Sequence, residues 1–267
     1  MYEAYWGLQE HPFENTPDPR FFYASSQHQE ACARMLYCIR ERKGAALLTG
    51  AFGCGKTMVA YAIFNELNQE RYRTAYLTNP RLNDLDLLRM IAHALGAPSV
   101  PATKADVLML LEGQIRDNAN EGRDTVIVVD EAHTIQDPNV FEELRLLLNW
   151  QARDRFLITL LLLGQPELAQ AINQNKAFEQ RIGIKSKLEP LSLADTTAYL
   201  IHRLRLAGHP DPASIFSGDA MKLIYESSGG VPRRINRLTD ICLLAGFGAK
   251  RMIDAELVRD EIKGLAV

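Results

Sequence analysis

Between positions 50 and 57 the chain reads Gly50-Ala51-Phe52-Gly53-Cys54-Gly55-Lys56-Thr57. The stretch follows a short apolar segment at 45–49 and opens an amphipathic segment at 56–69. It matches the pattern G-x-x-x-x-G-K-[ST], and a strand before it and a helix after it are the context in which this pattern forms a phosphate-binding P-loop. Ordinary residue frequencies give such a match by chance in roughly one chain in a hundred of this length. The sequence therefore favours a P-loop over a glycine-rich turn.

The P-loop residues have distinct expected roles in binding a nucleotide such as ATP. Glycines let the backbone fold around phosphate, so that its N–H groups and the positive end of the following helix face the β-phosphate. Lys56 would reach the β- and γ-phosphates, and the hydroxyl of Thr57 would ligate Mg²⁺. The predicted nucleotide-binding residues of this stretch are Gly50, Gly53, Cys54, Gly55, Lys56, Thr57 and Met58.

A second motif, at 125–131, is a hydrophobic strand that ends in two acids, Asp130 and Glu131. This is the form of a Walker B motif, in which Asp130 would hold Mg²⁺ and Glu131 would orient or deprotonate the attacking water. A strand end followed by an acidic helix cap is the alternative, and the P-loop makes it the weaker one. His133 completes the sequence Asp-Glu-Ala-His, and the sequence leaves open whether it does more than pack behind the acids.

Polar residues also follow two other expected strands. Asn79 ends the second strand, and the carboxyl ends of parallel strands face the ligand crevice. Asn79 would bind Glu131 when no partner is present and release it on activation, although a turn at Asn79-Pro80 explains the residue equally well. Gln165 follows the fourth strand and would place an amide near the γ-phosphate or the attacking water.

Two arginines are candidates for stabilising a charged transition state, because the planar guanidinium donates two hydrogen bonds to phosphate oxygens. Arg181 comes just before the last expected strand, at the edge of the nucleotide domain, where it would reach a neighbouring subunit. Arg233 opens a helix of the C-terminal region and would fold over the nucleotide of its own chain. A surface cation without such a role is the alternative for either residue.

Around these motifs the chain alternates short apolar runs with longer amphipathic segments. Such alternation predicts a parallel sheet covered by helices on both faces, which is an α/β fold. After Pro190 the strand signals stop and helices alone follow. We therefore expect an N-terminal arm at 1–26, a nucleotide-binding α/β domain at 27–190 and a helical lid at 191–267. Strands are expected at 45–49, 74–78, 125–129, 156–163 and 184–188, and helices at 26–42, 56–69, 84–95, 104–120, 138–152, 193–207, 219–227, 232–247 and 255–262.

Composition excludes several other classes of protein. The chain has 267 residues, of which 47% are hydrophobic and 24% charged, so it is neither disordered nor fibrous. No apolar run approaches the 18 or so residues of a spanning helix, and the N-terminus lacks the features of a secretory signal. The four cysteines show neither metal-ligand spacing nor a disulfide pattern. We expect a cytoplasmic protein that does not insert into the membrane; a net charge of −3 leaves nucleic-acid binding open.

The order of the motifs resembles a known family. P-loop, Asp-Glu-Ala-His, Leu-Gly-Gln-Pro-Glu-Leu, Gln-Arg-Ile and Gly-Gly-Val-Pro-Arg-Arg-Ile-Asn look like the AAA+ ATPases related to general secretion pathway protein A (ExeA). The resemblance extends to the arm, with Pro12-Phe13 and Thr16-Pro17-Asp18-Pro19, and so covers nearly the whole chain. Cys54 departs from the small or hydroxyl residue common before the last P-loop glycine, which bears on packing around the nucleotide.

The resemblance implies an AAA+ sheet with the P-loop strand central, a helical lid and nucleotide bound between them. It also implies sensor 1 at Gln165, an arginine finger at Arg181 and sensor 2 at Arg233, with subunits assembled into rings or filaments. The secretion protein continues into a transmembrane helix and a peptidoglycan-binding domain, whereas this sequence ends at Val267. The resemblance therefore predicts a stand-alone ATPase form, anchored, if at all, by another protein.

Three hypotheses about function follow. In the first, the ATPase assembles or remodels envelope machinery for secretion, pilus formation or polysaccharide export. In the second, it resembles the target-selecting ATPases of transposons and forms filaments on duplex DNA, with phosphate contacts made by basic residues. In the third, it is a slow ATP-gated switch that binds a partner in one state only. The basic residues considered for DNA are Arg233, Arg234, Arg237, Lys250 and Arg251.

Overall fold

The structure, a computed structural model, describes residues 1–152 and 155–265. These residues form two compact units. The sheet unit consists of residues 28–52 and 59–188, and the helical unit consists of residues 1–27, 53–58 and those from 189 onward. The helical unit thus contains the N-terminal arm and most of the P-loop as well as the C-terminal helices.

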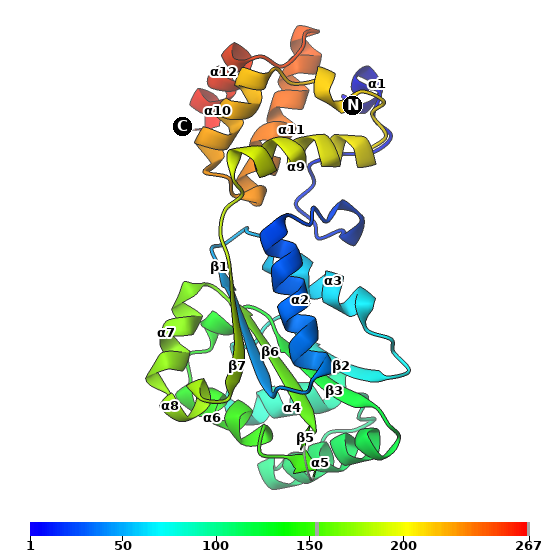
Figure 1. Cartoon of the computed structure of the whole chain (residues 1–267), viewed down its shortest axis with the longest axis vertical. Coiled ribbons are helices and arrows are strands. Elements are labelled where there is room, and N and C mark those ends of the chain that lie inside the picture. Colours follow the sequence, from blue (N-terminus) through cyan, green and yellow to red (C-terminus); the bar gives the residue numbers. More distant parts are fainter. Residues whose placement is uncertain (153–154, 266–267) are drawn as a thin grey trace. The chain divides into compact units, whose positions relative to one another are not determined.

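The sheet unit is built on a five-stranded parallel sheet with the order β2-β3-β6-β1-β7 (Figure 1). Leu162 of β6 aligns with Leu47 of β1 on one side and with Val129 of β3 on the other. The predicted α/β fold is confirmed, with one correction to what the resemblance implies. The P-loop strand β1 lies inside the sheet, but β6 is the middle strand. The strands are β1 (Ala45–Gly50), β2 (Tyr72–Leu77), β3 (Asp124–Val129), β6 (Ile158–Gly164) and β7 (Ile182–Leu188).

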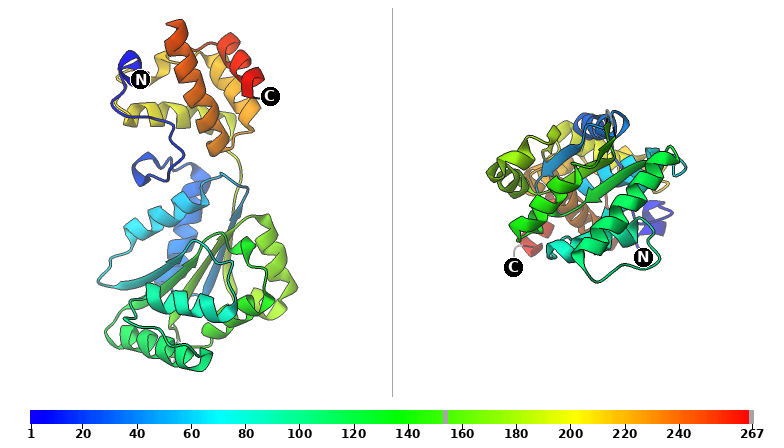
Figure 2. Two further views of the ribbon diagram at one scale, coloured as in Figure 1. Left: turned by 180° about the vertical axis from the view of Figure 1, so that it is seen from behind. Right: turned by 90° about the horizontal axis from the view of Figure 1, so that it is seen from below.

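Helices cover both faces of this sheet, because alternate residues of each strand point to opposite faces and both sets are apolar. Ala75, Ile127 and Leu160 belong to the core that the sheet forms with α4 to α8. The residues next to these in the strands, such as Val126 and Leu161, are also buried. Figures 1 and 2 show α2 over one face and α4 over the other. The helices are α2 (Ser26–Arg40), α3 (Lys56–Glu66), α4 (Asp84–Ala94), α5 (Lys104–Asn120), α6 (Pro138–Leu147), α7 (Pro166–Gln174) and α8 (Lys176–Glu179), with a 3-10 turn η2 (Ala132–Thr134).

The largest difference from the sequence-based prediction lies between α6 and β6. The helix expected at 138–152 ends at Leu147, and a short antiparallel hairpin follows, formed by β4 (Gln151–Ala152) and β5 (Arg155–Phe156). The predicted end of this helix was wrong because Asn149 and Trp150 continue the amphipathic pattern of α6 beyond its last turn. Helices α7 and α8 were not predicted, because at nine and four residues they are too short to give a sustained periodic pattern.

The helical unit has its own core, to which the arm contributes large side chains. Serines cap two of its helices: Ser192 accepts a hydrogen bond from the Asp195 N–H at 3.1 Å, and Ser217 accepts one from the Ala220 N–H at 3.1 Å. The elements of this unit are α1 (Glu3–Trp6), η1 (Pro19–Phe21), α9 (Leu193–Leu206), η3 (Pro212–Ser214), α10 (Gly218–Ser228), α11 (Pro232–Ala249) and α12 (Ala255–Leu265).

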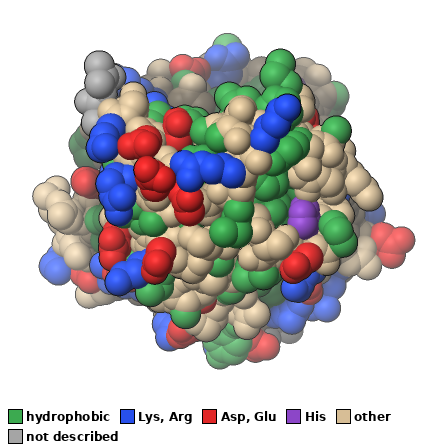
Figure 3. Space-filling model, turned by 90° about the horizontal axis from the view of Figure 1, so that it is seen from above, with side chains coloured by type: hydrophobic (Ala, Val, Ile, Leu, Met, Phe, Trp, Pro, Cys, Tyr) green, Lys and Arg blue, Asp and Glu red, His purple; other side chains and the backbone are tan. Residues whose placement is uncertain are grey.

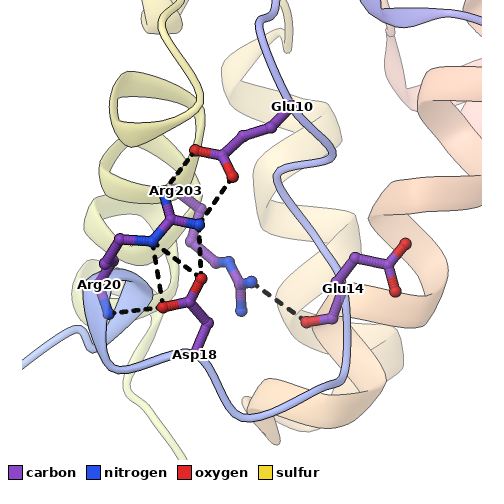
Figure 4. A network of polar contacts seen from close by, with 5 residues as sticks. All are labelled: Glu10, Glu14, Asp18, Arg20 and Arg203. Atoms are coloured by element: carbon purple, nitrogen blue, oxygen red, sulfur yellow. Dashed lines mark hydrogen bonds and ion pairs between the residues drawn. The ribbon is translucent and has the colours of Figure 1, made fainter.

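The arm packs onto this unit through a buried arginine. Arg203 of α9 donates hydrogen bonds to the Glu14 carbonyl oxygen at 3.1 Å and to the Tyr199 hydroxyl at 2.8 Å. Its guanidinium also lies over the Phe21 ring at 4.7 Å, a cation–π contact. Around it Arg20 joins Glu10 and Asp18 in an exposed ion-pair network (Figure 4). The arm is therefore folded against the lid helices, with two short helical turns of its own.

Within residues 1–152 and 155–265, no helix combines the length and the apolar character that a membrane span requires.

Candidate functional site

The strands of the parallel sheet end at one edge, and several predicted site residues of the sheet unit follow those ends. Gly50 closes β1, Asp130 comes directly after β3 and Gln165 comes directly after β6. Because β6 lies between β1 and β3, the start of the P-loop and the two acids flank Gln165 at this edge. This carboxyl edge is the position at which open α/β sheets bind their ligands.

Close packing explains the first glycine of the P-loop. A Cβ atom on Gly50 would lie 2.8 Å from the carbonyl oxygen of Leu188, which is the last residue of β7. No side chain fits at that distance, because the contact is with the backbone. Gly50 therefore allows β1 and β7 to stay paired up to the point at which the loop leaves the sheet.

The middle of the P-loop is shaped by glycines in the left-handed region of the backbone. Gly53 has φ +83° and Gly55 has φ +94°, conformations that disfavour any other residue. A run of such residues turns successive N–H groups toward one concave side, the arrangement that binds phosphate. Lys56 follows as the first residue of α3 and is 5% exposed, and Cys54 is 1% exposed. These residues fit the polyphosphate of a nucleotide.

Arg233 lies against this loop within the helical unit. Its backbone N–H donates to the Gly53 carbonyl oxygen at 3.4 Å. A Cβ on Gly53 would lie 2.8 Å from the Arg233 Cβ and 3.1 Å from a methyl group of Val231. Gly53 thus has two reasons to be glycine: its φ angle and the approach of α11. The structure brings together the P-loop and Arg233, which are about 180 residues apart in the sequence.

Asp130 is buried and held by two hydrogen bonds in the sheet unit. It is 3% exposed, and its carboxylate accepts from the Tyr76 hydroxyl at 2.9 Å and from the Glu131 N–H at 2.8 Å. Burial first, and then the negative charge of Asp130, raise the pKa of Tyr76 above its ordinary value, so the phenol stays a donor at neutral pH. Carboxylate oxygens are ligands that Mg²⁺ prefers, so Asp130 suits that ion.

Glu131 has an unusual backbone conformation and contacts the next polar residues. Its φ is +54°, in the left-handed region that a non-glycine residue adopts only at a cost. Its carboxylate lies 3.5 Å from His133 Nε2, and that nitrogen lies 2.8 Å from Gln165 Nε2. Glu131 and Gln165, two predicted site residues, are therefore linked through His133.

Asn79 and Arg181 are not joined to this group in the part of the chain described. Asn79 is exposed, and no hydrogen bond links it to Glu131 among the described residues. Arg181 precedes β7, so it lies at the amino edge of the sheet, opposite the edge that carries Asp130. There it donates to the Asn149 side-chain oxygen at 2.9 Å. The binding of Glu131 by Asn79 and the role of Arg181 as an arginine finger stay predictions.

Sequence reasoning missed Tyr76 and Asn149 and left His133 open. Tyr76 pairs with Val128 in the register of β2 and β3, which places its side chain near the end of the Walker B strand. A tyrosine in the second strand is a visible signal, but its meaning depends on knowing that β2 neighbours β3. Asn149 gives no signal, because it lies in a loop that was expected to be helical.

The chain is similar in sequence to known proteins. Residues 39–172 match the family model described as an AAA domain. Over 275 aligned positions the chain is 38% identical to general secretion pathway protein A of Aeromonas hydrophila, covering 99% of this chain and 49% of that protein. The chain thus spans about half the length of this curated relative.

Solved structures share the fold at low identity. The ORC2 protein of Aeropyrum pernix superposes with a TM-score of 0.72 at 18% identity, covering 97% of this chain and 72% of that one. Cdc6p from Pyrobaculum aerophilum superposes with a TM-score of 0.70 at 20% identity, covering 94% and 69%. At such identity the likeness extends to the fold alone.

Proposed function

Because the chain belongs to the AAA domain family, we propose that it binds ATP and hydrolyses it to ADP and phosphate at subunit interfaces. The observation that carries the proposal is the carboxyl edge of the sheet, where the start of the P-loop, Asp130 with Glu131, and Gln165 follow neighbouring strands. A protein that binds ATP without hydrolysing it needs the P-loop. It does not need a second acid such as Glu131, linked through His133 to the amide of Gln165. The arrangement therefore favours hydrolysis.

The residues divide the reaction between them. P-loop N–H groups and Lys56 bind the phosphates, and Glu131 accepts a proton from the attacking water while Gln165 orients it. Thr57 and Asp130 would hold Mg²⁺, which supplies positive charge to the phosphate oxygens. Tyr76 keeps the Asp130 carboxylate fixed through the 2.9 Å hydrogen bond. Arg233 contacts Gly53 and lies in the first turn of α11, so it moves with that helix. Its side chain would bind the γ-phosphate.

The position of Arg181 supports self-association. At the amino edge of its own sheet it is separated from the acids by the length of a strand, about 20 Å for six or seven residues. Such an arginine contributes to catalysis only in the site of a neighbouring subunit. We therefore propose a ring or filament in which each Arg181 completes the next site.

We propose envelope machinery as the partner, because 38% identity along 99% of this chain relates it to general secretion pathway protein A. The cytoplasmic location expected from the sequence stays a prediction. The third hypothesis, a slow switch, shares the same site and differs from the first only in the rate of turnover with partner present.

The basic residues considered for DNA do not form one patch. Arg233, Arg234 and Arg237 lie at the start of α11 and Lys250 follows its end, so about 20 Å of helix separates the two groups. Arg251 is paired with Asp254 at 2.7 Å and Glu256 at 3.5 Å. On the face shown in Figure 3, Lys and Arg side chains are interspersed with Asp and Glu. This distribution gives the DNA hypothesis less support than the envelope hypothesis.

Glu131→Gln tests the proposal. Loss of the base should lower ATP turnover by about 10²- to 10⁴-fold, while Mg²⁺-dependent ATP binding persists and ATP-bound assemblies accumulate. Glu70→Gln, an exposed residue near β2, is the matched control and should hydrolyse ATP normally. Free hydrolysis by Glu131→Gln would refute the assigned base.

Duplex DNA separates the partner classes in the same assay. If DNA at low salt neither stimulates the wild-type ATPase nor supports filaments with a non-hydrolysable ATP analogue, the DNA hypothesis fails. Very slow turnover even with an envelope partner would favour the switch.

A further inference from the structure

His133 is the one histidine of the Asp-Glu-Ala-His motif, and its contacts place it between two residues of the proposed reaction. It is 14% exposed at the side chain. Its Nε2 lies 2.8 Å from the Gln165 amide nitrogen and 3.5 Å from a carboxylate oxygen of Glu131. Its other ring nitrogen, Nδ1, is buried without a hydrogen-bond partner among the described residues.

These contacts select one tautomer of the imidazole. A neutral imidazole carries its proton on one nitrogen and a lone pair on the other. A proton on Nδ1 would bury an unpaired donor and turn the Nε2 lone pair toward the Glu131 carboxylate, which is repulsive. A proton on Nε2 faces the carboxylate oxygen favourably and leaves only a bare acceptor at Nδ1. The Nε2–H tautomer is therefore favoured.

The same choice fixes the amide of Gln165. With the amide nitrogen next to the imidazole, Gln165 would donate to a bare Nε2. A half-turn of the amide exchanges its nitrogen and oxygen, and a protonated Nε2 then donates to the amide oxygen instead. The NH₂ group of Gln165 then points away from the imidazole, where it is available to donate to a water or a phosphate oxygen. An amide turned the other way would present an acceptor to the anionic phosphate instead.

The backbone is built to allow this approach. A Cβ on Gly164 would lie 3.1 Å from the His133 backbone nitrogen and 2.8 Å from Leu168 Cδ2. Gly164 is the last residue of β6 and directly precedes Gln165. Its missing side chain lets the turn η2, which carries His133, lie close to the end of β6. The left-handed conformation of Glu131 begins that turn.

We propose that His133 is a positioning residue that orients both the Glu131 carboxylate and the Gln165 amide through its Nε2–H. It sets the direction in which the Gln165 amide donates its hydrogen bond, and it links Gln165 to the proposed base, Glu131. This inference rests on the proposed ATP hydrolysis, and it assigns no proton transfer to His133 itself.

A double-mutant cycle tests the link through turnover. His133→Phe should lower kcat about 10- to 100-fold, because the Nε2–H that orients the Gln165 amide and faces the Glu131 carboxylate is lost, with KM for ATP nearly unchanged. His133→Gln, which keeps an N–H donor within reach, should restore most of kcat. In a Gln165→Ala background His133→Phe should cost less than it does in wild type, because the contact with Gln165 is already absent and only the contact with Glu131 remains to be lost. His93→Phe, on the exposed end of α4, is the control and should match wild type.

Two outcomes of that cycle would overturn the proposal: full kcat in His133→Phe, or effects of His133→Phe and Gln165→Ala that simply multiply. Circular dichroism and thermal unfolding establish that each variant is folded. If His133→Phe unfolds the sheet unit, His133→Gln replaces it in the cycle. Its kcat is then compared with that of His133 both in wild type and in the Gln165→Ala background.

Nitrogen NMR of the nucleotide-free protein provides a readout independent of hydrolysis. The signal of His133, assigned by its loss in His133→Gln, should show Nε2 protonated and Nδ1 bare. Gln165→Ala should shift the Nε2 resonance. An Nδ1–H tautomer, or no shift, would overturn the proposal. A wild-type protein that showed the expected spectrum yet never hydrolysed ATP would refute the proposed function and leave this geometry standing.

Discussion

The carboxyl edge of the sheet and the polar group around Arg203 in the helical unit are both clusters of polar side chains, but they are assembled differently. At the sheet edge, Asp130 and Gln165 directly follow neighbouring parallel strands, so the fold repeats one geometry at each strand end. In the helical unit, Arg203 binds the carbonyl oxygen of Glu14, which lies 189 positions earlier in the chain. The first cluster follows from local sequence and topology, and the second requires the complete tertiary fold.

The two clusters should therefore respond differently to mutation. Changes to Glu131, Gln165 or Arg181 should alter turnover while leaving the protein folded, because these side chains are partly exposed. Changes around Arg203 should alter stability first, because that side chain is 6% exposed and packed on aromatic rings. Lower turnover without lower stability after changes at the sheet edge, and lower stability after changes around Arg203, would confirm the distinction.

Arg181→Ala should have the largest effect on rate. Removal of an arginine finger lowers turnover by about 10³- to 10⁵-fold in other nucleotide hydrolases. ATP affinity should persist, because Arg181 lies at the amino edge of its own sheet. Equilibrium binding and steady-state turnover per subunit measure the two effects. Mixing Arg181→Ala with Glu131→Gln should restore part of the activity if the finger acts in a neighbour's site; unchanged turnover in Arg181→Ala alone would eliminate it as the finger.

Gly53→Ala should weaken ATP binding about tenfold or more. The substitution adds a Cβ at φ +83° and 2.8 Å from Arg233 Cβ, so either the loop or the start of α11 must move. Gly113→Ala is the control: Gly113 lies within α5 with open space around it, and alanine there should stabilise the helix by about 1 kcal/mol. Normal ATP affinity in Gly53→Ala would contradict the proposed contact of Arg233 with the loop.

Arg203→Met should lower the stability of the helical unit by about 2 kcal/mol, because the hydrogen bonds to Glu14 and Tyr199 and the cation–π contacts are lost. The chain has two tryptophans, and Trp6 belongs to the helical unit while Trp150 belongs to the sheet unit. In a Trp150→Phe background, Trp6 fluorescence during urea unfolding therefore reports on the helical unit. Arg205→Met, exposed on the same helix, should change the midpoint little; equal midpoints for both variants would refute the role of Arg203.

The sequence was sufficient to predict the sheet, the lid helices and the motif residues at strand ends, because hydrophobic periodicity and the P-loop pattern are local signals. It did not predict the hairpin before β6, where a continuing pattern extended a helix that ends at Leu147. It also left His133 undecided and missed Tyr76. The meaning of these two side chains depends on which strands are neighbours, and spacing along the chain does not contain that information.

The smallest expected effect is a pH dependence of the helical unit that arises from His202. Burial, and then the positive charge of Arg203, lower the pKa of His202 below its ordinary value, and its Nε2 is buried without a partner among the described residues. The folded state then binds fewer protons than the unfolded state once the pH falls below about 6.5. Stability should therefore be fully present above that pH and decrease as the pH falls toward the folded-state pKa, by at most about 1.4 kcal/mol per pH unit. In the Trp150→Phe background, His202→Asn should flatten this dependence between about pH 7.5 and 5.5, whereas His209→Asn, on the loop after α9, should not; an unchanged slope in His202→Asn would assign the acid sensitivity of this unit to other groups.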